Sequence, residues 1–163
     1  MSDHPIEDAI CQKLMGEARE GALDLVAFMR QEGFSFEWFD LGNGGDIGWN
    51  PAHHGAGFGT IMVAPEWSQE GDGFILWLGP NCAFEDGDLA DGDLKEFAWA
   101  HVVACPQAKY CKPPYCVNSE NRWSIFGRPY ESTCHAPLAF FNPDAKAFQN
   151  IKKLMSLMQI RRD

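Results

Sequence analysis

The sequence predicts an α+β domain that joins an N-terminal helix, an antiparallel sheet of about four or five strands, a C-terminal helix and a cysteine-rich irregular segment. Three observations predict this class. Apolar residues recur at helical spacing near both ends of the chain, alternate at strand spacing in its first half, and lose their period across residues 105–135. Because the chain has 163 residues, of which 45% are apolar and 22% charged, we expect residues 1–163 to form a single globular domain.

The first expected element is a helix over residues 5–31. Its apolar stripe consists of Ile6, Ile10, Leu14, Ala18, Ala22, Val26 and Met29. Spacings of three and four residues place these side chains on one face of a helix. Glycine is a poor helix former, so Gly16 or Gly21 is the expected position of a break, and Gly33 ends the helix.

Strands are expected after this helix. Aromatic residues alternate with polar ones from Phe34 to Trp38, which is typical of a strand with one buried face. Two further apolar runs, residues 59–64 and 73–78, are predicted strands, and their short connection favours antiparallel pairing. The two glycine-rich stretches that precede them are predicted turns rather than phosphate-binding loops, because neither leads into a helix N-terminus.

Shorter elements are expected in the middle of the chain. An aspartate of the acidic stretch over residues 85–93 is expected to cap a helix through residues 94–100. The register of this stretch departs from the EF-hand pattern by one inserted residue, so we predict a solvated loop rather than a calcium site. Residues 101–104 and 123–126 are short strand candidates.

The most regular pattern predicts a C-terminal helix. Asn142 is the predicted N-cap, Pro143 suits the first helical position, and Asp144 complements the helix dipole. Its buried face is predicted to hold Phe148, Ile151, Leu154, Met155 and Met158. Lysine and arginine residues cover the rest of the helix.

The N-terminal residues predict a cytoplasmic protein. Acidic residues stand where a secretory signal needs positive charge, and no apolar run approaches the roughly 18–20 residues of a membrane-spanning helix. No membrane partner is therefore expected. The six cysteines are Cys11, Cys82, Cys105, Cys111, Cys116 and Cys134. In a reducing compartment such thiols stay free or bind metals, so a disulfide framework is not expected.

The formal net charge of −10 is divided unevenly along the chain. Residues 1–100 carry 19 acidic and 4 basic side chains, whereas residues 101–163 carry 4 acidic and 9 basic ones. The overall acidity argues against nucleic acid as a partner, because clustered lysine and arginine supply the affinity for a phosphate backbone. The split predicts that the two halves attract each other or present faces of opposite sign.

The strongest candidate for a functional site is a cysteine cluster in the irregular segment. Three of its cysteines follow the pattern Cys105-x5-Cys111-x4-Cys116, and Cys134-His135 follow after seventeen intervening residues. Thiolates bind zinc tetrahedrally, and a structural metal orders a segment that has little core of its own. We therefore predict a zinc site from the first three cysteines and either Cys134 or His135. The first gap is longer than in the usual zinc knuckle, so buried, reduced cysteines acting as small apolar side chains are the alternative.

Three further features give weaker signals. The pair His53-His54 lies between glycines and is predicted to be an exposed turn rather than a metal or proton-transfer site. The 21 aromatic residues are expected to fill the core rather than line a ligand pocket. No nucleophile stands beside a base in the sequence, so a thiolate–imidazole pair requires His101 or His54 to approach a cysteine through the fold.

Several short motifs also carry a resemblance. They are Trp99-Ala100-His101-Val102, Cys105, Ile125-Phe126-Gly127-Arg128, Cys134, Phe141-Asn142-Pro143-Asp144 and Ile151-Lys152-Lys153-Leu154. In this order they resemble the C-terminal half of a family of small bacterial proteins of uncharacterised activity, which share the order of cysteines, an Ile-Phe-Gly-Lys-type strand and an Asn-Pro-Asp helix start. The resemblance covers about sixty residues. It implies that the four cysteines from Cys105 to Cys134 form one unit, and it implies no activity.

Three functions are compatible with these patterns. The first is a non-enzymatic binding domain for a small molecule or a protein partner, in which the cysteine segment is a structural element that holds zinc. The second is an enzyme that uses a cysteine thiolate or a bound metal. The third is a regulatory interaction module whose charge split selects its partner.

Overall fold

The computed structural model describes residues 5–40, 47–64, 73–78, 92–102, 123–125, 128–130 and 138–159. The helices are α1 (Ile6–Lys13), α2 (Gly16–Gln31), α3 (Gly92–Ala100) and α4 (Ala145–Gln159). The strands are β1 (Phe34–Asp40), β2 (Ile47–His53), β3 (Ala56–Gly57), β4 (Gly59–Val63), β5 (Phe74–Leu78), β6 (Trp123–Ile125), β7 (Arg128–Tyr130) and β8 (Leu138–Phe141). The predicted α+β class with N- and C-terminal helices is confirmed.

The main sheet is antiparallel at every pairing. Its strands follow the order β1-β2-β4-β5-β8, and the short β3 pairs with β2 as a sixth strand. One aligned row of residues crosses all five ordered strands, because each of its members pairs directly with the next. The row is Trp38, Trp49, Ile61, Leu76 and Phe140. β6 and β7 form a separate two-stranded hairpin.

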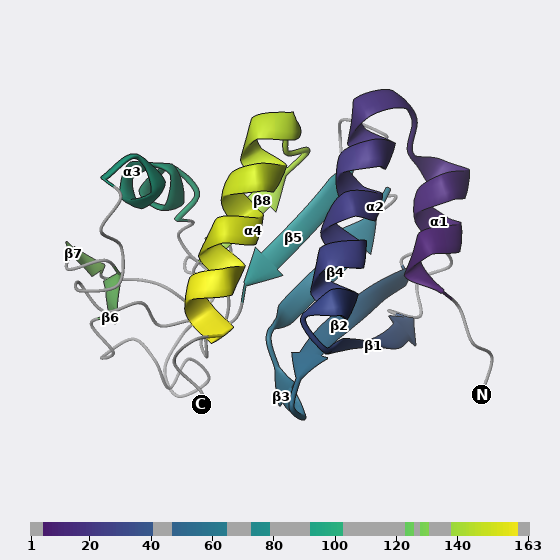
Figure 1. Cartoon of the computed structure of the whole chain (residues 1–163), viewed down its shortest axis with the longest axis horizontal. Coiled ribbons are helices and arrows are strands. Elements are labelled where there is room, and N and C mark those ends of the chain that lie inside the picture. Colours follow the sequence, from purple (N-terminus) through teal and green to yellow (C-terminus); the bar gives the residue numbers. More distant parts are fainter. Residues whose placement is uncertain are drawn as a thin grey trace, which may run out of the picture.

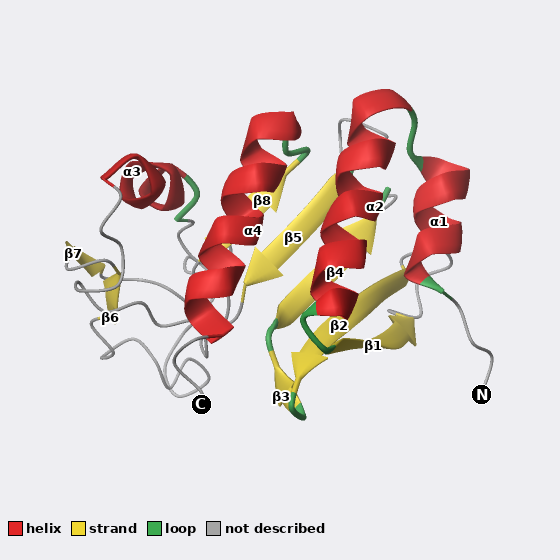
Figure 2. Ribbon diagram, viewed as in Figure 1, coloured by secondary structure: helices red, strands yellow, loops and turns green. Residues whose placement is uncertain are grey.

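The helices cover one face of this sheet. Figure 1 shows α1, α2 and α4 side by side across the strands, with α3 at the end of the molecule where β8 lies. The same view coloured by secondary structure makes the two layers plain (Figure 2). Four of the five residues of the aligned row are buried in the main apolar core together with the inner faces of α1, α2 and α4, and Trp38 packs against it partly buried. The core therefore lies between the two layers.

The expected helix over residues 5–31 is broken where the sequence predicted. α1 ends at Lys13, the backbone is extended at Leu14 and Met15, and α2 begins at Gly16, which has a φ of +56°. This conformation favours glycine, since a Cβ atom is strained there. The break lets α1 fold back against α2, and the guanidinium of Arg30 donates to the carboxylate of Glu7 at 2.5 Å across the pair. At the other end, Gly33 with a φ of +86° ends α2, as predicted.

α2 and α4 pack directly against each other. Gly21 of α2 lies under the ring of Phe148 of α4, and a Cβ atom at residue 21 would overlap that ring. The ammonium of Lys152 lies 2.5 Å from the carboxylate of Asp24 along the same seam. This ion pair joins the acidic first part of the chain to its basic last part.

β2 and β8 were not predicted as strands. β2 contains Asn50 and Pro51, which are rare in strands, yet it pairs with β1 along its whole length and with β4 at Gly48 and Trp49. β2 and β3 are joined by His54 and Gly55, whose φ values of 48° and 78° are those of a tight hairpin turn. In β2, pairing with a strand on each side overrides the local composition, whereas β8 is a short apolar run that pairs with β5, distant from it in the sequence. None of the helices in these described ranges has the length and apolar character needed to cross a lipid bilayer.

Candidate functional site

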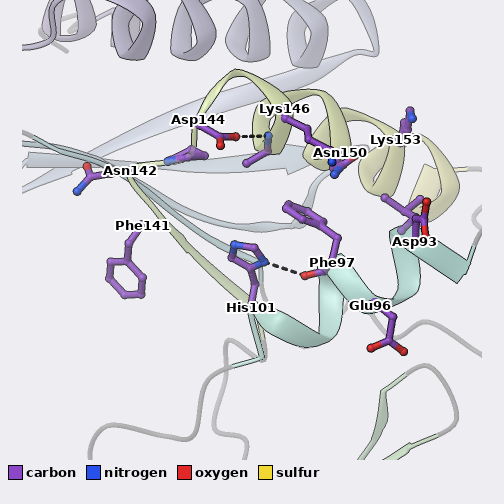
Figure 3. Close-up of a pocket in the computed structure, with 13 residues that line it drawn as sticks. Asp93, Glu96, Phe97, His101, Phe141, Asn142, Asp144, Lys146, Asn150 and Lys153 are labelled. Atoms are coloured by element: carbon purple, nitrogen blue, oxygen red, sulfur yellow. Dashed lines mark hydrogen bonds between the residues drawn. The ribbon is translucent and has the colours of Figure 1, made fainter.

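A pocket of about 750 Å³ lies between α3, the end of β8 and the first three turns of α4. Its lining consists of Asp93, Leu94, Glu96, Phe97, His101, Phe141, Asn142, Pro143, Asp144, Lys146, Ala147, Asn150 and Lys153. Figure 3 shows the lysines and Asn150 along α4, opposite Asp93 and Phe97 of α3. α3 ends at Ala100 and α4 begins at Ala145, so only the fold brings these segments together.

α3 forms one wall of the pocket because its apolar positions dock it on the core. Leu94 and Ala98 are four residues apart, lie on one face of the helix and are buried. The ring of Phe97 stacks on that of Phe140 in β8, with centroids 5.7 Å apart and planes inclined by 17°. Asp93 and Glu96 of the same helix are also among the lining residues, and the side chain of Glu96 points away from α4 (Figure 3).

His101 is held in a defined orientation just beyond α3. Its ring lies 4.5 Å from the ring of Phe97 and 4.8 Å from that of Phe140, measured between centroids. Its Nδ1 atom is 2.8 Å from the backbone carbonyl oxygen of Phe97 (Figure 3). A carbonyl oxygen only accepts, so the neutral ring carries its proton on Nδ1 and has the lone pair on Nε2. The backbone of His101 is fixed as well, since its carbonyl accepts from Ala139 of β8 at 3.0 Å.

The turn between β8 and α4 forms the floor of the pocket. Asn142 has a φ of +45°, a conformation that asparagine tolerates better than most residues. Its backbone N–H donates to the carbonyl of Phe74 at 2.8 Å, and its side-chain Oδ1 accepts from the N–H of Phe74 at 3.1 Å. Gly73 leaves room for this side chain, because a Cβ atom at residue 73 would collide with Oδ1. Asn142 therefore extends the pairing of β5 with β8 by one residue and fixes the entry into α4.

Asp144, and not Asn142, is the N-cap of α4. Its side-chain oxygen accepts from the N–H of Ala147 at 2.7 Å, and its carbonyl accepts from Phe148 at 2.9 Å (Figure 3). The predicted cap position was two residues too early because Asn142 is a good capping residue by type. Its side chain is instead used by the strand pairing described above.

The pocket face of α4 carries polar groups on a single stripe. Lys146, Asn150 and Lys153 are four and three residues apart, which places them on the same side of the helix. The opposite side holds Phe148, Ile151, Leu154 and Met155, all buried in the core as predicted. Within the described ranges, neither Lys146 nor Lys153 has an ion-pair partner.

Opposite charges meet in this pocket. The ionisable lining consists of three carboxylates and two ammonium groups, in addition to His101. The side chain of Phe141 is 52% accessible and packs edge-on against Trp77 at 6.3 Å, on the sheet face opposite to that of its buried neighbour Phe140. The arrangement of charged groups can therefore bind an anionic group through the lysines and a cationic group through the carboxylates.

The residues predicted to bind zinc are Cys105, Cys111, Cys116, Cys134 and His135. All five lie outside the described residues, as does Cys82. Cys11 is exposed on α1. Among the residues that are described, no three histidine, cysteine, aspartate or glutamate side chains are arranged to hold a metal ion. The zinc site stays a prediction.

The histidine pair at the β2–β3 hairpin differs from the expected exposed turn. His54 is exposed in the turn, but His53 is only 8% accessible and its ring lies 4.9 Å from that of Phe34. The Nδ1 atom of His53 has no hydrogen-bond partner among the described residues. Position 53 is the last residue of β2, and its side chain points to the same side of the sheet as Phe34, its direct partner.

Sequence reasoning named some pocket residues without recognising a pocket. His101 was noted as a base that could approach a thiol, and residues 142–144 were read as the start of a helix. The signal that was missed is the stripe of Lys146, Asn150 and Lys153, which looks like any solvated helix face. Nothing local indicates that α3 lies opposite.

The chain was also compared with known proteins, and these comparisons supply no relative. No protein-family model, no curated protein and no solved structure matches this chain. The family resemblance over residues 99–154 therefore stays a prediction.

Proposed function

We propose that this chain is a binding domain that takes a small polar ligand in the pocket between α3 and α4. The observation that carries the proposal is that one pocket is lined by several polar atoms with no partner in the described residues. They are Nε2 of His101, the second carboxylate oxygen of Asp144, and the ammonium groups of Lys146 and Lys153. In the described part of the chain these atoms have no hydrogen-bond or ion-pair partner.

Size and rigidity support this proposal. A volume of about 750 Å³ lies within the range of roughly 300–1,000 Å³ that is usual for small-molecule sites. The walls are held by buried contacts: Leu94 anchors α3, the two hydrogen bonds between Asn142 and Phe74 anchor the floor, and Phe148 anchors α4. A site on such supports loses little conformational entropy when a ligand binds.

The contacts of His101 fix the orientation of its ring. Its described hydrogen bond joins Nδ1 to a backbone carbonyl. In the neutral ring, Nε2 can therefore accept from a ligand. There are two alternatives. One is an enzyme that uses a cysteine thiolate or a bound metal, and the other is a regulatory interaction module. The NMR screen described next bears on all three functions.

The test is an NMR screen of the ¹⁵N-labelled chain against a diverse library of small polar compounds. We expect compounds that shift the amide resonances of residues 93–101 and 141–153 and leave those of α1 unchanged. The double substitution Lys146→Gln with Lys153→Gln should weaken anionic members of the library several-fold, since each exposed ion pair contributes about 0.2–1 kcal/mol. Lys13→Gln, on α1, is the matched control. Binding that maps elsewhere, or no binding at all, would refute the proposal.

A further inference from the structure

We draw no further inference here: the strongest candidate, the apolar patch of Met62, Ile75 and Phe141 on the sheet face away from the helices, supports no proposal because nothing in the described part of the structure shows what covers it.

Discussion

The two sides of α4 differ in how closely each packs against its neighbouring helix. Toward α2, the contact is closed: Gly21 admits the ring of Phe148, and Lys152 pairs with Asp24 along the seam. Toward α3, the side chains are Lys146, Asn150 and Lys153, and a pocket of about 750 Å³ separates the two helices. The distance between packed helices depends on the size of the side chains at their contact. A glycine opposite a phenylalanine closes one side, and polar side chains on the other leave space.

The two neighbours of α4, α2 and α3, also differ in how they are held on the core. α2 has 16 residues and buries Ala22, Leu25, Val26 and Met29, whereas α3 has nine residues and buries Leu94 and Ala98. The longer helix therefore contributes more apolar burial, and the shorter one needs other supports. Stacking of Phe97 on Phe140 and the backbone hydrogen bond between Ala139 and His101 are two of them. The predicted zinc site would be a third, because its residues lie in the chain between α3 and β8.

Removal of zinc is the largest expected effect. If four of the predicted ligands hold a structural zinc ion, the purified protein contains one zinc per chain. A chelator then withdraws an apparent binding free energy on the order of 10 kcal/mol. Elemental analysis measures the metal, and thermal unfolding with and without chelator measures the loss. Cys134→Ser should abolish zinc retention.

The control for this prediction is Cys11→Ser. Cys11 is exposed on α1, at the end of the helical layer away from α3, so its substitution should change neither metal content nor unfolding temperature. A metal-free protein in which all cysteines react slowly and uniformly with a thiol reagent would contradict the zinc prediction and support buried, reduced thiols.

The next largest effect is expected at the closed side of α4. Phe148→Ala removes a fully buried ring that touches α2 and also lies 5.5 Å from the ring of Phe74. The free energy of unfolding should fall by about 3–5 kcal/mol, as is usual for a buried phenylalanine. Denaturant unfolding monitored by tryptophan fluorescence measures the change.

A double-mutant cycle with Gly21 tests whether this contact closes the seam. Gly21→Ala alone should destabilise the chain by about 1–3 kcal/mol, because the added methyl group overlaps the ring of Phe148. In the Phe148→Ala background the same substitution should be neutral or stabilising, because the space is free and alanine is the better helix former. Additive effects of the two substitutions would show that the ring does not set the approach of the helices.

A smaller effect on stability is expected at Asp144, the N-cap of α4. Asp144→Ala removes the cap of α4 and should cost about 1 kcal/mol of stability, whereas Asp144→Asn should retain most of it. Thermal unfolding of both variants measures the difference. Equal loss in the two variants would show that the charge of Asp144, rather than its hydrogen bond to Ala147, stabilises the helix.

The smallest effect concerns the ion pair between α1 and α2. The guanidinium of Arg30, which donates to both carboxylate oxygens of Glu7, lowers the pKa of Glu7 from its ordinary value of 4.5. The folded state thus favours the ionised form, so this stabilisation is present above about pH 4.5 and is lost as the pH falls through the lower folded-state pKa. Because Glu7 and Arg30 are 34% and 47% accessible, solvent screening keeps the contribution below about 1 kcal/mol.

Glu7→Gln should therefore reduce the loss of folding stability at acidic pH. The free energy of unfolding, measured by denaturant titration between pH 3 and 6, should depend less on pH in this variant than in the parent. Glu17→Gln, at an exposed position of α2, is the control and should keep the parental slope. An unchanged slope in Glu7→Gln would mean that the pair with Arg30 does not stabilise the fold.

Local sequence patterns predicted the elements in which local preference and tertiary contacts favour the same structure. The alternation from Phe34 to Trp38 is β1, the runs at residues 59–64 and 73–78 are β4 and β5, and the break near Gly16 separates α1 from α2. β2 was missed because Asn50 and Pro51 oppose a strand locally, and the cap of α4 was misplaced because Asn142 suits two roles. For the cap, a partner 68 residues away decided the outcome, and for β2 it was pairing with β1 and β4 on its two edges.

The sequence by itself determined the α+β class, the antiparallel pairing and the buried face of α4, because periodicity of apolar residues reports which face of an element leaves water. Only the tertiary structure decided that the polar face of α4 lies opposite α3 and that Asn142 bonds to Phe74. The physical reason is that a polar stripe has the same pattern whether it faces solvent or a pocket. The difference lies in what packs across from it, and that depends on contacts between residues about 40–70 positions apart in the chain.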